Sequence, residues 1–445
     1  MIIMKFGGTS VADAQAMKQA AEIVVNAQEP VLAVLSACSG ITNKLVEVAK
    51  QSVHISDADR NSLIDEIIQY HQSVANDLKL QDDQVQETIL KLGEDLRSFC
   101  EGISILGECT KRSYDKAASF GELLSTVIFN AFLSKNGNQS SWFDARDCMK
   151  TNSDFMKAVV DEQLLSDAVN EKLIPQFEKH IIIITQGFIG SDAEDSTTTL
   201  GRGGSDYSAA LFGASLQADS IIIWTDVSGI ASADPRIIPD AFFIPSMSFD
   251  EARMLSFFGA KVLHPETILP ALDKDIPVYV KNTFRPMDAG TKLTRKGDPT
   301  QKGMRSVIGK NNVSLIKIRS LKHGEADIET VNRFLASLPG IVLLSGGIEH
   351  SLYAIVDCLE VEIRKHVDVM REHSIEIKEG TLISAVGPNF HAASSEAAIK
   401  GFYEIVFQCE SHPVFISGLQ SNTLNAFIQT KNALPILQKL HGLCS

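Results

Sequence analysis

The sequence predicts an α/β fold in which a parallel-rich sheet is sandwiched by helices, followed by two smaller ferredoxin-like α+β modules. Apolar, β-branched runs alternate with segments of helical periodicity in the first part, and glycine-rich turns join them. Beyond residue 310 the elements become shorter and follow the order strand–helix–strand–strand–helix–strand. These two patterns together define the predicted fold class.

The first predicted unit is a strand, a helix and a second strand. Ile2–Phe6 is a short apolar run that ends at Gly7 and Gly8. Apolar residues then recur at helical spacing from Val11 to Val24, and Val31–Ser36 forms a second buried run. A connection of this length predicts two parallel strands with a right-handed crossover.

The same alternation continues along the chain. The remaining elements of this part are predicted as helices over residues 57–106, 120–132 and 206–216, and as strands over residues 140–143, 180–185 and 220–225.

A basic segment separates the two parts. It contains Gly297, Pro299 and Gly303 among several lysines and arginines, which is typical of a solvated linker. We therefore predict a domain over residues 1–292, a linker over 293–310 and paired modules over 311–445. The modules' elements are predicted as strands over 313–318, 341–345, 352–356, 414–417 and 424–429, and as helices over 326–338, 360–372, 396–408 and 434–440.

Composition excludes some partners. The 445 residues carry 41 Lys and Arg against 55 Asp and Glu, a net charge of −14, which argues against a nucleic-acid or membrane-surface binder. Seven scattered cysteines without a Cys-x-x-Cys pair predict reduced thiols. No signal-peptide pattern and no run of about 20 apolar residues is found, so we expect a cytoplasmic protein.

Three segments carry candidate chemistry. In Lys5–Ser10, a lysine at a strand end precedes two glycines, whose amides can approach phosphate oxygens. The alternative is a tight turn in which Ser10 caps the following helix. In Gly201–Asp206, Arg202 lies among three glycines and can grip a carboxylate or phosphate, whereas Asp206 can be a plain helix cap or can orient nearby lysines.

The third segment, Trp224–Ile230, places Thr225 and Asp226 at the end of a buried strand, where open α/β sheets bind ligands. The alternative is an ordinary turn, because Asp, Ser and Gly favour turns. No His/Cys cluster has zinc spacing, and no Gly-x-Ser-x-Gly elbow occurs. We therefore assign no metal-ligating residue.

Together these segments resemble aspartokinases of the amino-acid-kinase superfamily. The ordered motifs that carry the resemblance are Lys5–Val11, Ser36–Asn43, Thr185–Gly190, Thr197–Tyr207, Thr225–Gly229 and Lys261–Pro265. The resemblance implies ATP- and magnesium-dependent phosphorylation of the side-chain carboxylate of L-aspartate, the first step toward lysine, methionine and threonine. It also implies that the trailing modules are ACT domains that support regulation and a homodimer or higher homo-oligomer.

The resemblance assigns roles to individual residues. Catalysis falls to Lys5, Asp206 and Lys261, with the amides of Gly7 and Gly8 beside the phosphoryl group. The residues implied to bind aspartate are Ser36, Thr42, Glu122, Arg202 and Ser205, with Glu122 pairing with the ammonium and Arg202 with a carboxylate. The residues implied to contact the nucleotide are Gly7, Gly8, Thr225, Asp226, Arg236 and Lys261.

The chemistry implied is consistent with these residue types. An aspartate side chain is already ionised at neutral pH, so no general base is needed. Catalysis then depends on positioning and on neutralising two approaching anions.

Two departures from the family pattern carry consequences. Ala231 stands where a tyrosine is common, so we expect altered nucleotide affinity. The segment Ser320–Asp327 has charged and bulky residues where a glycine-rich apolar turn is usual, so the resemblance does not predict feedback inhibition by lysine or threonine. Two alternatives remain open at this point: a non-catalytic amino-acid sensor, and a sibling kinase acting on glutamate or a nucleotide.

Overall fold

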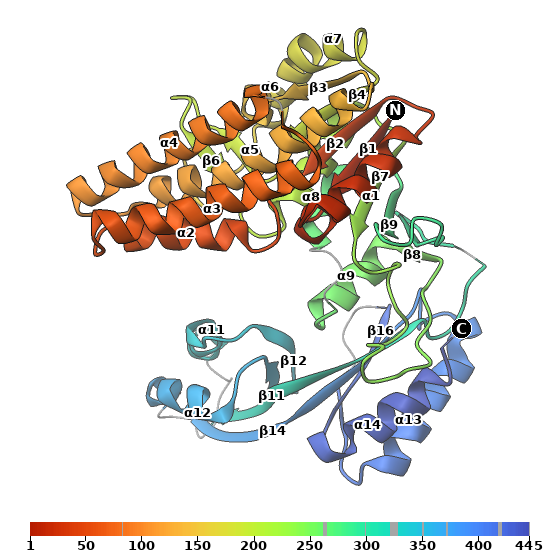
Figure 1. Cartoon of the computed structure of the whole chain (residues 1–445). Coiled ribbons are helices and arrows are strands. Elements are labelled where there is room, and N and C mark those ends of the chain that lie inside the picture. Colours follow the sequence, from red (N-terminus) through yellow and green to blue (C-terminus); the bar gives the residue numbers. More distant parts are fainter. Residues whose placement is uncertain are drawn as a thin grey trace. The chain divides into compact units, whose positions relative to one another are not determined.

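The computed structural model describes residues 1–81, 83–260, 265–298, 300–320, 328–348, 351–370, 373–416 and 421–444. The chain divides into two units (Figure 1). Unit 1 comprises Met1–Ile230 and Leu263–Arg295, and unit 2 comprises Ala231–Val262 and Lys296–Ser445. The predicted domain limits at residues 292 and 310 remain predictions.

Unit 1 contains a mainly parallel sheet and the helices that cover it. Its strands are β1 (Ile2–Phe6), β2 (Val31–Leu35), β3 (Ser140–Phe143), β4 (Ile182–Gln186), β5 (Ile189–Ser191), β6 (Thr197–Thr199), β7 (Ser220–Thr225), β9 (Val278–Asn282) and β10 (Thr291–Thr294). Its helices are α1 (Ala14–Val25), α2 (Ile41–Gln51), α3 (Asp57–Asp77), α4 (Asp83–Leu106), α5 (Lys111–Lys135), α6 (Glu162–Ala168), α7 (Ile174–Phe177), α8 (Gly204–Ser215) and α10 (Leu269–Asp273).

The strand order in unit 1 is β3-β4-β2-β1-β7-β9-β10. Neighbouring strands are parallel from β3 to β9, whereas β10 runs antiparallel to β9. Because β4, β2, β1 and β7 are parallel neighbours, their carboxyl ends meet at one edge of the sheet. Strand β1 lies between β2 and β7, with Lys5 paired in register with Val34 and Ile223.

Apolar residues on both faces of the strands bury the sheet between helices. Met4 and Phe6 of β1 belong to a large core formed with helices α1 to α5, whose ribbons lie together in Figure 1. On the opposite face α8 packs closely, because a Cβ built on Gly213 would lie 2.6 Å from Ile221. The sandwiched parallel-rich sheet predicted from the sequence is therefore confirmed.

Helix α5 is long and apolar enough to span a membrane by length and composition, and it is the one such helix in the described residues. Of its most apolar window, 72% is buried inside the protein. Its buried residues, such as Phe120, Leu124 and Phe129, belong to the core of unit 1. The hydropathy of α5 is therefore explained by packing.

The first helix begins later than predicted. Residues Gly8–Val11 form a 3₁₀ turn, and α1 starts at Ala14 with the Asp13 side chain accepting the Ala16 N–H. The alternative in which Ser10 caps this helix is therefore wrong. Its buried hydroxyl instead bonds to the Trp224 carbonyl and to Thr283, which ties the turn to the neighbouring strands.

Unit 2 contains an antiparallel sheet with helices. Its elements are β8 (Ser246–Ser248), α9 (Phe249–Phe257), β11 (Ser306–Ser320), α11 (Ile328–Ser337), β12 (Val342–Ile348), β13 (Ser351–Val356), α12 (Glu360–Ile363), β14 (His373–Val386), α13 (Glu396–Cys409), β15 (Val414–Phe415), β16 (Thr423–Ile428) and α14 (Ala433–His441). The element order predicted for the two ferredoxin-like modules is confirmed.

The two modules share one sheet of order β12-β13-β11-β14-β16-β15. Strands β11 and β14 pair over their whole length, from Ser306 opposite Val386 to Ser320 opposite His373. Strand β11 starts inside the segment predicted as a linker and crosses both modules. The helix predicted over residues 360–372 is shorter, because α12 continues as a 3₁₀ helix over Arg364–Met370.

Candidate active site

A cavity of about 560 Å³ opens at the carboxyl ends of the central strands of unit 1. The predicted site residues that line it are Lys5, Gly7, Gly8, Ser36, Thr42, Glu122, Arg202, Ser205, Asp206 and Thr225. Three others are placed differently. Asp226 and Arg236 are not among its lining residues, and Lys261 lies outside the described residues.

Lys5 is one of the two cations that line this cavity in the described part of the chain. Its Nζ lies 2.7 Å from Asp206 Oδ1, and the two side chains are only 12% and 14% exposed. Lys5 extends from the end of β1, whereas Asp206 lies in the first turn of α8. The pair is well shielded from solvent, so it holds the ammonium at a fixed position facing the cavity.

The glycine turn after β1 lies close to the ammonium, because a Cβ built on Gly7 would be 3.6 Å from Lys5 Nζ. Gly7 donates its N–H to the Trp224 carbonyl at 3.2 Å, and a Cβ built on Gly8 would lie 3.0 Å from the Ala37 carbonyl. Side chains are therefore poorly accommodated where the turn approaches the loop after β2. Helices α2 and α8 also begin beside the cavity, and their N-terminal ends favour an anion.

Two hydroxyls connect the loops on either side of Lys5. Ser36 Oγ donates to Ser205 Oγ at 3.0 Å, which joins the end of β2 to the start of α8. This approach is close: a Cβ built on Gly187 would lie 2.6 Å from the Ser205 Cβ. Glycine at position 187 is therefore required by packing between β4 and α8.

Glu122 is a buried carboxylate on the wall of the cavity. It is 3% exposed and lies on α5, and its Oε2 has no hydrogen-bond partner in the described part of the chain. Burial raises the pKa of this carboxyl to about 8, against the opposing effect of a hydrogen bond from the Ala37 backbone. An ammonium group in the cavity would supply the missing partner.

Arg202 is the second cation. It is exposed on the loop between two glycines with positive φ, Gly201 at 76° and Gly203 at 74°. Its guanidinium forms no ion pair with any residue that the structure describes. It lines the Lys5 cavity and also an adjoining cavity with Glu162 and Tyr207. The guanidinium is therefore available to an incoming carboxylate.

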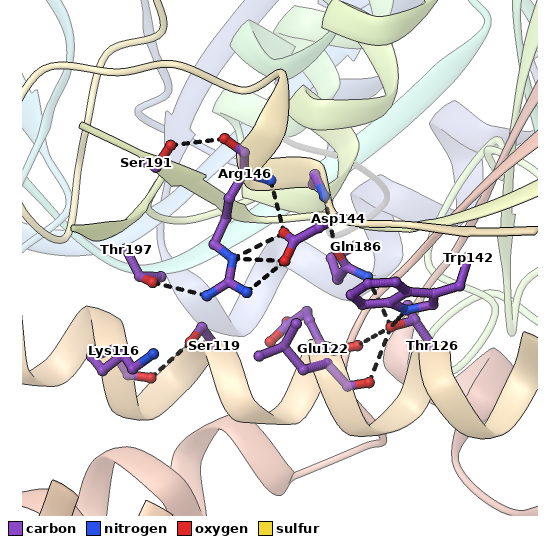
Figure 2. A network of polar contacts seen from close by, with 12 residues as sticks. Lys116, Ser119, Glu122, Thr126, Trp142, Asp144, Arg146, Gln186, Ser191 and Thr197 are labelled. Atoms are coloured by element: carbon purple, nitrogen blue, oxygen red, sulfur yellow. Dashed lines mark hydrogen bonds and ion pairs between the residues drawn. The ribbon is translucent and has the colours of Figure 1, made fainter. Parts of the chain in front are cut away.

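A polar network anchors the helix that carries Glu122 (Figure 2). Thr126 accepts hydrogen bonds from Trp142 Nε1 and Gln186 Nε2, both at 3.0 Å, and donates to the Glu122 carbonyl at 2.7 Å. Gln186 Oε1 in turn accepts the Ala145 N–H at 2.8 Å. These bonds join α5 to β3 and β4, so the position of Glu122 is fixed by buried, satisfied polar groups.

The residues after β7 form a second polar network. Asn282 donates to the Asp226 carbonyl at 3.2 Å and to Ser228 Oγ at 3.1 Å, and Ser228 donates to Asp288 at 2.5 Å. Thr225 donates to the Asp226 carboxylate at 3.1 Å. Asp226 is thus presented next to the cavity-lining Thr225.

Arg236 is not brought to the Lys5 cavity within either unit. It belongs to unit 2, is 86% exposed and pairs with Asp234 at 2.7 Å. The pKa of Asp234 is lowered by this guanidinium. The role assigned to Arg236 through the resemblance remains a prediction.

Sequence reasoning missed Phe188 and Asp115. Phe188 lines the cavity with a left-handed φ of 69°, and its N–H donates to Ser208 Oγ at 2.9 Å. Nothing in a Gln-Gly-Phe-Ile run indicates this conformation. Asp115 lies seven residues before Glu122, and that helical spacing could have indicated a second carboxylate on the same face of α5.

Comparisons with known proteins agree on one family. Residues 1–282 match the amino acid kinase family. Lysine-sensitive aspartokinase 3 of Escherichia coli (strain K12) is 38% identical over 321 residues, which cover 72% of this chain and 70% of the relative. Aspartokinase 2, chloroplastic, of Arabidopsis thaliana is 36% identical over 330 residues, covering 72% of this chain and 59% of the relative.

Solved structures extend the likeness to the whole chain. The crystal structure of E. coli aspartokinase III in complex with lysine and aspartate (T-state) superposes with a TM-score of 0.84 at 32% identity, covering 99% of both chains. The same enzyme in complex with aspartate and ADP (R-state) gives a TM-score of 0.80 at 32% identity, also over 99% of both chains. The chain therefore belongs to the amino acid kinase family and, within it, to the aspartokinases.

Proposed function

We propose that the Lys5 cavity binds L-aspartate and the phosphates of ATP and transfers the γ-phosphoryl group to the side-chain carboxylate. The single observation that carries the proposal is the cavity at the strand ends. Around it lie the Lys5–Asp206 pair, the buried Glu122 carboxylate and the Arg202 guanidinium, which has no ion-pair partner in the described part of the chain. These groups complement a phosphate, a carboxylate and an ammonium. Their combination is that expected for an amino-acid substrate and a nucleotide.

The reaction needs charge neutralisation rather than proton transfer. A carboxylate oxygen of aspartate forms a bond to Pγ while the bond from Pγ to the bridging oxygen of ADP breaks, giving 4-phospho-L-aspartate and ADP. Lys5 neutralises the transferring group, and Asp206 keeps the ammonium oriented. Glu122 pairs with the substrate ammonium and Arg202 with a carboxylate, which together hold the nucleophile in line.

Asp226, Thr225 and Arg236 are proposed to contact the nucleotide, and Lys261 to neutralise its phosphates. Thr225 Oγ1 lies 3.1 Å from the Asp226 carboxylate, so these two polar groups can act on the same ligand. Ser36, Thr42 and Ser205 add hydroxyls to the aspartate side of the cavity. These assignments follow the resemblance and are testable one residue at a time.

Magnesium is proposed to enter with ATP. The described residues contain no group of three or more His, Cys, Asp or Glu side chains suited to hold a metal ion. Mg²⁺ does not require such a group, because it is commonly bound by substrate phosphates, water and only one or two carboxylates. Asp206 is the carboxylate of the cavity nearest Lys5, and the metal would supply further charge neutralisation at the phosphates.

We also propose that the protein acts in the cytoplasm as a homodimer or higher homo-oligomer formed through its ACT-like modules. Residues 321–327 of the predicted ligand turn lie outside the described residues. The Lys5 cavity favours catalysis over a non-catalytic sensor, since a sensor needs no ammonium fixed for a phosphoryl group.

Hydroxamate trapping with ATP, Mg²⁺ and L-aspartate tests the proposal. We expect aspartyl hydroxamate and stoichiometric ADP, and neither product when D-aspartate replaces the substrate. Glutamate and nucleoside monophosphates serve as alternative acceptors. Aspartate-induced thermal stabilisation without ADP release would identify a sensor, and turnover confined to another acceptor would identify a sibling kinase. Repeating the assay with lysine and with threonine tests feedback inhibition.

A further inference from the structure

Asp115 is a buried carboxylate on α5, two helical turns before Glu122. It is 1% exposed, and its partners in the described ranges are hydrogen-bond donors rather than a cation. Burial raises the pKa of this carboxyl, whereas the hydrogen bonds from Thr199 and Met156 act in the opposite direction. Burying a carboxylate here costs desolvation free energy, which its hydrogen bonds must offset. The donors of those bonds therefore show which segments Asp115 holds in place.

The first two bonds go to Thr199. The Thr199 N–H donates to Asp115 Oδ2 at 2.8 Å, and its hydroxyl donates to Oδ1 at 2.6 Å. Thr199 is the last residue of β6 and precedes Arg202 by three positions. The Thr199 carbonyl also accepts the Ala158 N–H at 2.9 Å. Thr199, from which the loop that carries Arg202 begins, is thus held at its N–H, its hydroxyl and its carbonyl.

The third donor is Met156. Its N–H lies 2.9 Å from Asp115 Oδ2 and 3.1 Å from Oδ1, in a turn where Met156 has φ 73°. The Met156 carbonyl packs against Gly201, since a Cβ built on Gly201 would lie 3.0 Å from that oxygen. Asp115 therefore fixes the surface against which the loop rests as well as the strand from which it begins.

Only a group that accepts at both oxygens can satisfy these donors. Asparagine has the same shape but presents an NH₂ group to one of the N–H or O–H donors. We infer that Asp115 is a positioning residue: by holding Thr199 and Met156, it fixes the Gly201–Gly204 loop so that Arg202 meets the acceptor carboxylate. This inference rests on the proposed function, in which Arg202 binds aspartate.

The inference differs from a purely structural role in what it predicts for kinetics. A residue that only stabilises α5 would lower the melting temperature and the fraction of folded enzyme, leaving the KM for aspartate unchanged. A residue that positions Arg202 raises the KM for aspartate and leaves the KM for ATP unchanged. A displacement of about 1 Å in a binding group is enough to cost large factors in rate.

The test compares Asp115→Asn, Thr199→Val and Thr199→Ser in the full-length protein. We expect Asp115→Asn and Thr199→Val to raise the KM for aspartate about ten-fold, as expected for a lost hydrogen bond to a charged group. Thr199→Ser keeps the hydroxyl and should stay within about two-fold of the wild type. In an Arg202→Ala background, Asp115→Asn should add no further increase.

A second readout does not depend on activity. Arg202 is exposed, so native trypsin cleavage after this residue, measured by mass spectrometry, reports opening of the loop. Asp115→Asn should raise the rate of this cleavage about ten-fold. Ser119→Ala is the matched control, because Ser119 is equally buried on α5 but donates to the Lys116 carbonyl of its own helix instead of to the loop. It should leave both readouts unchanged.

The outcomes separate the two claims. If the wild type gives no aspartate-dependent ADP, the proposed function fails, and the cleavage rate after Arg202 still decides whether Asp115 fixes the loop. If Arg202→Ala raises the KM for aspartate but Asp115→Asn and Thr199→Val leave both KM and cleavage unchanged, the inference is overturned. Equal changes in Ser119→Ala would overturn it as well.

Discussion

Lys5 Nζ and Asp206 Oδ1 lie 2.7 Å apart, joining the central strand β1 to the first turn of α8. Both side chains are shielded, so the attraction is stronger than that of an exposed pair. The ammonium is thereby held at the carboxyl ends of the parallel strands instead of sampling many rotamers. For an aspartokinase, this geometry presents a fixed positive charge to the phosphoryl group.

Replacing Lys5 by alanine should lower kcat by about 10²- to 10³-fold, the usual cost of removing a positioned group that stabilises transition-state charge. Asp206→Asn should cause a smaller loss, because the ammonium stays in place but is less well oriented. Coupled detection of ADP release measures both. The exposed Lys18→Ala is the control. Turnover of Lys5→Ala within about three-fold of the wild type would refute the assigned role.

Arg202→Ala should raise the KM for aspartate by about 100-fold while changing the KM for ATP little, because a bidentate, charge-assisted contact is lost at one substrate only. Arg202→Lys keeps the positive charge but loses the bidentate guanidinium, so its KM for aspartate should lie between those of the wild type and Arg202→Ala. The half-buried Arg97, which pairs with Asp65, supplies a control substitution to alanine. A shared increase in both KM values would show that Arg202 does not distinguish the substrates.

Much of this arrangement could be predicted because it depends on local periodicity. Alternating apolar runs and helical segments indicate parallel strands, and parallel strands bring their carboxyl ends to one edge. Motifs that end those strands, such as those of Lys5, Ser36 and Thr225, must then lie around a common site. The structure places all three at the same cavity.

What could not be predicted depends on long-range contacts. Ser10 suits a helix cap by type, yet it bonds to Trp224 and Thr283 because the helix starts only after Asp13. The left-handed backbone of Phe188 and the hydrogen bonds from Thr199 to Asp115 depend on segments that meet only in the folded chain. No local pattern in the sequence encodes such encounters.

The raised pKa of Glu122 predicts a pH-dependent stability. Burial raises this pKa from 4.5 to about 8, so the folded protein binds a proton that the unfolded chain has released in that interval. The contribution of Glu122 to the free energy of unfolding should therefore be largest below pH 4.5 and fall toward pH 8, by at most about 1.4 kcal/mol per pH unit. Glu122→Gln should lack this contribution, and the difference between the two urea-denaturation profiles isolates it.

The same carboxyl predicts a pH-dependent affinity for aspartate. Pairing with an ammonium needs the ionised form, which becomes populated as the pH rises toward about 8. The KM for aspartate should then fall about ten-fold or more between pH 6 and pH 8, in proportion to the competent fraction. Glu122→Gln should bind weakly and show a flat profile. A wild-type KM that is constant over this range would argue against Glu122 as the ammonium partner.

Two glycines test how closely the site is packed. A Cβ on Gly187 would lie 2.6 Å from the Ser205 Cβ and 2.8 Å from its Cα, so Gly187→Ala must push the start of α8 away from β4. We expect a loss of about 1–3 kcal/mol in unfolding free energy and a higher KM for aspartate, because Ser205 and Asp206 move with the helix.

Gly102→Ala is the matched control for this substitution. Gly102 lies in the interior of α4, and a Cβ there meets no atom within 4 Å. Alanine is the better helix former by about 0.5–1 kcal/mol, so this variant should be slightly more stable with unchanged kinetics. Chemical denaturation and steady-state kinetics on both variants provide the comparison. Equal behaviour of the two would mean that β4 and α8 tolerate separation, and that close contact between Gly187 and Ser205 is not what aligns the aspartate site.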